Sequence, residues 1–192
     1  TARTQELQSR TLHSNDLLDG TFVLNDQEVY YNVGVRYRGS PWGRPSRANL
    51  RIRFPDDRPY RGLRAVNLSS RGSSPNEGAV HYLEARSSGA GVPIPVADYR
   101  WARVMLNGTA LGIYGVVQTV DSDFLGKWYG EDATGPALKA VGRIDYHDDL
   151  QWLWDGASYI HMGIETENYR GYFTHAVRRT EDVWEPLFAL TK

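Results

Sequence analysis

The chain contains no cysteine among its 192 residues. This absence excludes a disulfide framework, a zinc site built on thiolates and a thiol nucleophile. The chain also lacks any apolar run of about 18 residues, so the sequence predicts no membrane span. Basic and acidic residues are nearly equal in number, because 22 basic and 23 acidic residues leave a net charge of −1. We therefore expect no nucleic-acid partner, since the whole chain lacks the basic character that such proteins show.

Several catalytic and metal-binding motifs are absent as well. There is no G-x-S-x-G elbow, no Walker loop and no G-x-G-x-x-G, and the five histidines include no pair four residues apart. Residues 145–155 are rich in acids, and oxygen-rich clusters can bind Ca²⁺ or Mg²⁺. Their spacing fits no EF-hand loop, so a solvated acidic loop is the favoured interpretation.

What the chain does contain is the composition of an ordinary folded domain. Apolar residues make up 41% and charged residues 23%, and the length suffices for one sizeable core. Residues 1–18 are polar, and we expect them to be frayed or extended. From residue 19 onward the sequence changes to short runs of alternating apolar and polar residues, which indicate β-strands.

Four runs predict neighbouring strands in the first third of the chain. Residues 21–25 alternate and end in the turn-forming pair Asn25-Asp26. Residues 29–38 place apolar or aromatic side chains at odd positions against a mainly polar even face. Residues 49–54 direct Leu50, Ile52 and Phe54 inward and their arginines outward, and residues 65–70 form another short strand.

The rest of the chain predicts a hairpin and three helices. Two β-rich runs flank Asn107-Gly108, the strongest short hairpin pattern available. Residues 77–89 are the best helix candidate, and a shorter helix is expected after Asp121 or Ser122, either of which can cap it. A strand at 136–141 and a terminal helix from 181 complete the pattern. The sequence thus predicts an α+β fold, a mainly antiparallel β-sheet with one central helix.

Residues 33–54 hold six arginines around a Gly/Pro loop. Four of them, Arg36, Arg38, Arg51 and Arg53, alternate on two predicted neighbouring strands and should share one face. Like charges on one face repel unless acids or an anion lie nearby. A salt-bridged outer face is the favoured interpretation, with Glu28, Asp56 and Asp57 as candidate partners; contact with phosphate ranks second. Nucleic-acid binding, with Tyr37 and Trp42 stacking on bases, ranks last.

Several collinear segments resemble one protein family. They are NVGVRYRGS (32–40), NLRIRF (49–54), AVNLSS (65–70), GVPIPVADYRWARVMLNGTALGIYGVVQTVD (91–121), DFLGKWYG (123–130), PALKA (136–140) and TENYRGYFTHAVRRTED (166–182). In order and spacing they resemble the CotH family, the spore-coat protein H-like atypical protein kinases. The resemblance covers roughly residues 19–192.

The resemblance implies a kinase-like division into a sheet-rich N-lobe and a helical C-lobe. The family's catalytic Asp lies in an Asn-rich C-lobe segment and its metal-binding Asp in a W-D-x-D-type segment, and neither segment occurs in these 192 residues. We therefore expect a polar N-terminal extension (1–18), a CotH-like N-lobe (19–180) and the start of a C-lobe helix (181–192). The missing C-lobe would belong to a separate segment or chain.

The resemblance also implies ATP and Mg²⁺ as cofactors of intact members and suggests three nucleotide-binding positions. Arg47 falls on the first lysine of the family's loop-ending pair, and Ala48 falls on the second. Lys139 matches a family lysine, although a strand lysine in solvent is the ordinary alternative. Gln118 replaces a family glutamate, so it can hydrogen-bond a lysine but cannot supply a counter-charge. No catalytic and no metal-binding residue is predicted within the chain itself.

Two functions follow as hypotheses. Intact relatives would transfer phosphate from ATP to protein Ser/Thr hydroxyls, with this chain lacking the catalytic C-lobe. Alternatively, the chain is a non-catalytic structural or interaction domain of an extracellular or surface assembly. The missing catalytic segments and the replacement at Gln118 favour this second hypothesis for the chain as given. Ala79 favours it too, because the family has an arginine there, near the start of the helix at 77–89. The resemblance favours an extracellular, cell-surface or spore-surface location, and a protein substrate or assembly partner is expected.

Overall fold

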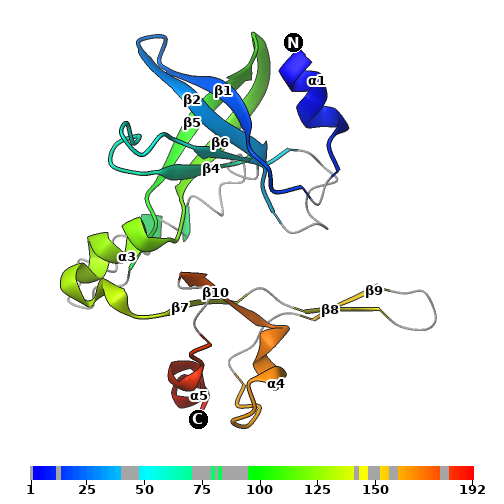
Figure 1. Cartoon of the computed structure of the whole chain (residues 1–192), viewed down its shortest axis with the longest axis vertical. Coiled ribbons are helices and arrows are strands. Elements are labelled where there is room, and N and C mark those ends of the chain that lie inside the picture. The colour runs from blue at the N-terminus through cyan, green and yellow to red at the C-terminus, as the bar shows by residue number, and fades with distance from the viewer. Residues whose placement is uncertain are drawn as a thin grey trace. The chain divides into compact units, whose positions relative to one another are not determined.

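The structure is a computed structural model that describes residues 2–11, 14–39, 48–70, 79–80, 82–83, 95–140, 143–146, 152–155, 160–177 and 182–192. The chain divides into two compact units, Thr1–Phe124 and Leu125–Lys192. Antiparallel strands dominate the first unit, and the second combines two small antiparallel pairs with short helices, so the predicted α+β class is confirmed (Figure 1). The predicted boundaries after residues 18 and 180 do not coincide with the division between the units. No helix in the described ranges is long and apolar enough to cross a membrane.

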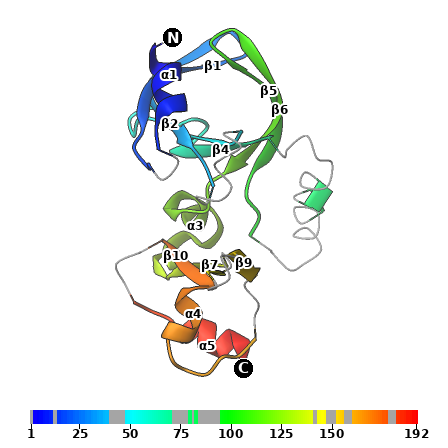
Figure 2. The ribbon, with the colours of Figure 1, turned by 90° about the vertical axis from the view of Figure 1, so that its right-hand side faces the viewer.

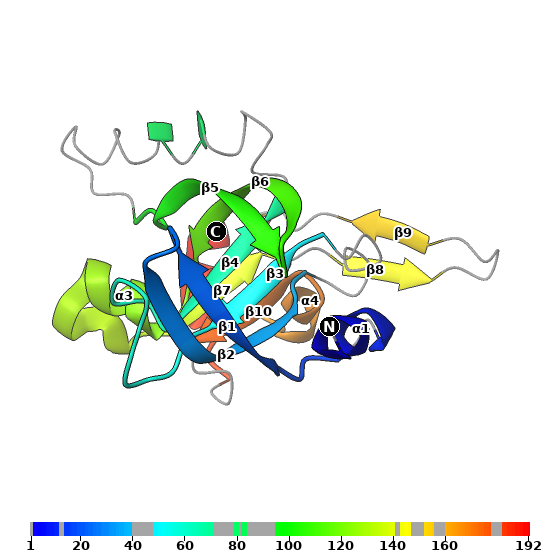
Figure 3. The same cartoon turned by 90° about the horizontal axis from the view of Figure 1, so that it is seen from above.

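The first unit is built on a six-stranded antiparallel sheet that curls around an apolar interior (Figure 3). Its strand order is β1-β2-β3-β4-β6-β5. The strands are β1 (Leu18–Leu24), β2 (Glu28–Tyr37), β3 (Leu50–Arg53), β4 (Ala65–Ser69), β5 (Tyr99–Leu106) and β6 (Thr109–Gln118). The predicted strands at 21–25, 29–38, 49–54 and 65–70 and the predicted hairpin around Asn107-Gly108 are therefore confirmed.

An aromatic cluster fills the interior of this unit. Phe22, Tyr30 and Phe54 meet edge to face, with ring centroids 5.3 to 6.0 Å apart, and Phe54 stacks on Tyr60 at 5.3 Å. Aromatic pairs of this kind stabilise a core beyond the area that they bury. The inward positions predicted for residues 50, 52 and 54 are confirmed, because all three side chains are buried.

The prediction of a frayed or extended N-terminal segment was wrong for residues 2–9. A helix, α1 (Ala2–Ser9), replaces the expected frayed or extended segment, and its Leu7 is buried in the core of the first unit. The Asn107 side chain also donates a hydrogen bond to the Thr4 hydroxyl. A polar sequence with one well-placed leucine can thus be held by tertiary contact, which helix propensity alone does not reveal.

Two turns adopt the backbone that their sequences predict. Asn25 and Asp26 have φ angles of 53° and 58° between β1 and β2, and Asn107 and Gly108 have 50° and 83° between β5 and β6. Positive φ at both central residues matches the right-handed twist of hairpin strands, and Asn, Asp and Gly adopt it at low cost.

A bulge in β2 breaks the strict alternation predicted for residues 29–38. Gly20 pairs with Val33 whereas Phe22 pairs with Tyr30, so two residues of β2 oppose one of β1. Asn32 takes a left-handed backbone with φ of 56°. As a result Tyr30 is buried and Tyr31 exposed, the reverse of the predicted orientation.

The second unit contains two small antiparallel pairs, of which Figure 2 shows β7 beside β10. The pair β7 (Ala137–Ala140) and β10 (Phe173–Val177) confirms the strand predicted at 136–141, and β8 (Arg143–Tyr146) pairs with β9 (Trp152–Asp155). Its helical elements are α3 (Ser122–Tyr129), which begins in the first unit, the 3₁₀ helix η4 (Gly130–Thr134), α4 (Glu167–Arg170) and α5 (Glu185–Thr191). Tyr169, Phe173, Trp184 and Leu187 form its core.

The helices predicted near residues 122 and 181 are confirmed as α3 and α5, the latter beginning at Glu185. The central helix predicted at 77–89 lies mostly outside the described residues. Its four described positions, 79, 80, 82 and 83, are helical. Val80, Tyr82 and Leu83, which were expected to form its apolar stripe, are each more than half exposed.

Candidate functional site

The structure describes two of the three predicted nucleotide-binding residues. Arg47 lies outside the described residues. Lys139 is an exposed residue of β7 in the second unit, whereas Gln118 is the last residue of β6 in the first unit and only 3% exposed. The candidate site is therefore built from Gln118 and its neighbours in the first unit, and the roles of Arg47 and Lys139 stay predictions.

Gln118 carries a buried hydrogen-bond donor that the described protein atoms do not satisfy. Its backbone N–H donates to the Asp98 carbonyl at 2.8 Å, and its side-chain Oε1 accepts the Asp98 N–H at 3.2 Å. The Nε2 group is buried and has no partner among the described residues. A buried polar group without a partner costs about 1–3 kcal/mol, so this donor favours a bound acceptor.

The segment after Gln118 is tied to the neighbouring strand β4. Asn67 is buried, and its Nδ2 donates to the Thr119 hydroxyl at 3.3 Å. That hydroxyl in turn donates to the Ala65 carbonyl at 3.5 Å. These contacts hold the chain in place just where it leaves the sheet.

Asp121 caps helix α3, as its position predicted. Its Oδ1 accepts the backbone N–H groups of Asp123 at 3.1 Å and of Phe124 at 3.4 Å. Burial raises the pKa of the Asp121 carboxyl above its ordinary value, and the negative charge of Asp123 adds to that rise. The two backbone N–H groups and the Arg51 guanidinium oppose it. Asp121 is thus a half-buried carboxylate beside the end of β6.

A salt bridge fixes the first turn of α3. Arg64 Nε lies 2.8 Å from Asp123 Oδ2 and its Nη2 lies 2.5 Å from Oδ1, while Nη2 also donates to the Ser122 hydroxyl at 2.7 Å. The hydrogen bonds from Arg64 lower the pKa of the Asp123 carboxyl. Paired hydrogen bonds from a guanidinium fix orientation as well as distance. Sequence reasoning missed this pair, because nothing local links residues 64 and 123.

The register of β2 and β3 places Arg36, Arg51 and Arg53 on one face as predicted, whereas Arg38 follows the end of β2. Arg36 stands directly opposite Arg51, and Gly34 directly opposite Arg53. The Nη1 group of Arg36 donates to the Tyr37 carbonyl at 2.8 Å. Arg53 forms an ion pair with Asp56 at 3.5 Å, one of the partners expected from the sequence. Glu28, another predicted partner, accepts a hydrogen bond from the Tyr30 hydroxyl at 2.9 Å instead. Asp57, the third, forms no ion pair within the described ranges.

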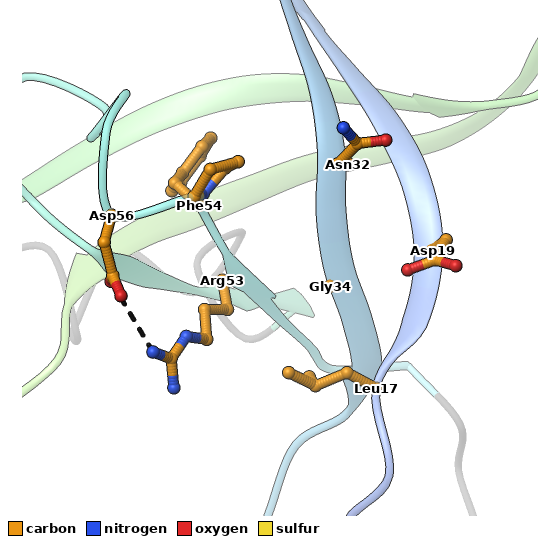
Figure 4. A pocket seen from close by; sticks show the side chains of 8 residues that line it. Leu17, Asp19, Asn32, Gly34, Arg53, Phe54 and Asp56 are labelled. Carbon is orange, nitrogen blue, oxygen red and sulfur yellow. Dashed lines mark ion pairs between the residues drawn. The ribbon is translucent and has the colours of Figure 1, made fainter.

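A second feature of the first unit is a shallow, open hollow of about 220 Å³. Its polar side chains are Asp19, Asn32, Arg53 and Asp56. Figure 4 shows Arg53 turned toward Asp56, with Asp19 and Asn32 on the neighbouring strands β1 and β2. The arginine is thus already engaged, and two carboxylates leave the hollow with a net negative charge. This arrangement does not favour phosphate.

In the described ranges no group of three or more His, Asp or Glu side chains could hold a metal ion. The acidic segment noted in the sequence (Asp145, His147, Asp148, Asp149 and Asp155) lies outside the residues whose side chains are described. The solvated-loop interpretation therefore stays a prediction.

Comparison with known proteins adds no family to these observations. Neither a scan against protein-family models nor a search of curated proteins returned a match to this chain. The candidate site must therefore be judged on its own chemistry, which consists of one buried amide donor, one capping carboxylate and a rigidly held connection between β6 and α3.

Proposed function

We propose that this chain forms the nucleotide-facing part of a CotH-like protein kinase and that Gln118 donates a hydrogen bond to the bound nucleotide. The observation that carries the proposal is the buried Nε2 group of Gln118, which has no acceptor in the described part of the protein. The collinear sequence segments that resemble the CotH family support it, because Gln118 occupies a polar position of that pattern.

Gln118 fits a bound nucleotide, because its buried Nε2 group can donate to an acceptor atom of the ligand. Bound ATP with Mg²⁺ would supply the phosphoryl group for transfer to a protein hydroxyl. Gln118 would hold an acceptor atom of the nucleotide, while the phosphate-neutralising roles of Arg47 and Lys139 stay predictions from the family resemblance. The contacts of Asn67 and Arg64 would keep the segment 118–123 in position. Phosphoryl transfer depends mainly on such positioning and on charge neutralisation.

A thermal-shift titration with ATP and Mg²⁺ tests the proposal. Ligand at 100 times its dissociation constant stabilises a protein by about 2.7 kcal/mol, which corresponds to roughly 5–10 °C in Tm at this chain length. Gln118→Leu should abolish the shift, because it replaces the side-chain amide, and with it the Nε2 donor, by an apolar side chain. Gln27→Leu, the same change at the exposed β1–β2 turn, is the matched control and should leave the shift intact.

Two results would count against nucleotide binding. One is the absence of any shift at millimolar ATP with the unaltered chain. The other is an equal shift in the Gln118→Leu variant and the control. Either result would leave the non-catalytic interaction domain as the better hypothesis for the chain.

A further inference from the structure

The β5–β6 hairpin presents an unusual surface to solvent. Its strands, green in Figure 1, turn at Asn107-Gly108. Trp101, Met105 and Ile113 are 55%, 56% and 57% exposed. Scattered exposed apolar residues are ordinary, whereas a contiguous apolar group marks an interaction site. Whether these three are contiguous depends on the register of the hairpin.

The register places the three apolar residues around one arginine. Arg103 lies directly opposite Ile113, and Trp101 and Met105 lie two residues to either side of Arg103 on the same face of β5. We call these four residues the hairpin face. Tryptophan, methionine and arginine are enriched at the centres of protein interfaces, where charged lysine and acids are depleted.

The charge of the hairpin is of one sign. Residues 99–118 include Arg100 and Arg103 and contain no Asp or Glu. Neither arginine forms an ion pair with any residue in the described ranges. A ligand for this surface therefore needs a carboxylate to complement Arg103, with apolar groups on both sides of it.

The position of β5 indicates the conformation of such a ligand. Among the described strands β5 is the last in the sheet, with β6 as its one neighbour. A terminal strand accepts an added strand through main-chain hydrogen bonds, and alternate side chains of the added strand then meet those of the edge strand. An added strand would bring a side chain beside each of Trp101, Arg103 and Met105 in turn.

From these observations we propose that the hairpin face is a docking site for an extended polypeptide segment of another protein. The segment presents a carboxylate to Arg103 and apolar side chains to Trp101 and Met105, and it adds to the sheet beside β5. This site is independent of the nucleotide proposed at Gln118, so either proposal can fail without the other.

Two labelled decapeptides test the proposal by fluorescence anisotropy. One is a Thr-rich strand peptide with Glu at its centre and Leu two residues to either side, and the other replaces Glu by Lys. The Glu peptide should bind about fivefold to tenfold more tightly, as expected for an opposite-charge rather than a like-charge cross-strand pair. Arg103→Glu should invert this preference, and Trp101→Ala should weaken the binding of both peptides.

Arg100→Glu is the matched control, because it makes the same charge change on the same strand but away from the hairpin face. It should retain the preference for the Glu peptide. Equal binding of the two peptides, binding of neither at about 1 mM, or loss of preference in Arg100→Glu but not in Arg103→Glu would overturn the proposal. Self-association of the chain that Arg103→Glu abolishes would also overturn it, by showing that a second copy occupies the face.

Discussion

Arg64 and Asp123 join two segments that are 59 positions apart in the sequence, through hydrogen bonds of 2.8 and 2.5 Å between the guanidinium and the carboxylate. The pair connects the residue before β4 to the first turn of α3. Asp121 lies two residues from Asp123 and has the opposite electrostatic behaviour, because burial raises its pKa whereas Arg64 lowers that of Asp123. The two carboxyls therefore respond differently to pH.

Asp123→Asn should destabilise the first unit by about 1 kcal/mol at pH 7, a modest value because Arg64 is 45% exposed and solvent screens the pair. Folding lowers the pKa of the Asp123 carboxyl. The carboxyl therefore stabilises the folded state at a pH above its ordinary pKa, and this stabilisation is lost as pH falls through the folded pKa. Urea unfolding between about pH 2 and pH 7 should thus show a smaller loss of stability with acid in the variant. An unchanged pH profile would contradict the assignment.

Asp121→Asn should leave stability at pH 7 equal or slightly higher. Folding raises the pKa of the Asp121 carboxyl. The carboxyl therefore adds most to the stability of the folded state at a pH below its unfolded pKa, and this stabilisation is lost as pH rises through the folded pKa. Asparagine keeps an oxygen for the helix cap and removes the buried charge. Asp121→Ala, which removes the cap, should cost about 1 kcal/mol. Comparing the two variants by urea unfolding separates the cap from the charge.

Two glycine substitutions should have opposite effects. A Cβ on Gly115 would lie 2.5 Å from the buried Tyr99 hydroxyl oxygen and 2.7 Å from the ring carbon Cζ. Gly115→Ala should therefore destabilise by about 1–3 kcal/mol through overpacking. Gly126 lies in α3 with open space around it, and Gly126→Ala should stabilise by up to about 1 kcal/mol. Thermal unfolding of both variants checks the signs, and a stable Gly115→Ala variant would show that Tyr99 is free to move.

The bulge in β2 yields a prediction about backbone conformation. Asn32 has φ of 56°, a conformation that glycine adopts at no steric cost and that β-branched residues avoid. Asn32→Gly should change stability little, whereas Asn32→Val should destabilise by about 1–3 kcal/mol. If Asn32→Val unfolds at the same urea concentration as the unaltered chain, the bulge is not a fixed part of the sheet.

Much of the architecture was accessible from local patterns. Alternation located β3, and it placed Leu50, Ile52 and Phe54 inside. The turn residues Asn25-Asp26 and Asn107-Gly108 located two hairpins, because their side chains tolerate the positive φ that tight turns require. The capping role of Asp121 was likewise predictable, since capping involves only residues within one helical turn.

Other features depended on contacts that local patterns do not encode. The strand at 29–38 was recognised, but its bulge was not, because the extra residue arises from pairing with β1. The N-terminal helix was missed, since one leucine packed into a distant core outweighs the polar character of its neighbours.

The candidate site divides in the same way. Its residue types, an amide at 118 followed by a carboxylate at 121, were evident from sequence, and so was the shared face of the strand arginines. Only the tertiary structure decided that Nε2 of Gln118 is buried without an acceptor in the described part of the protein, and that Trp101, Met105 and Ile113 surround Arg103 in solvent. The reason is physical: a side chain's own chemistry and its near neighbours in sequence determine what it can donate or bury. Whether a donor is satisfied, or an apolar group covered, depends on distant segments that approach it only when the chain folds.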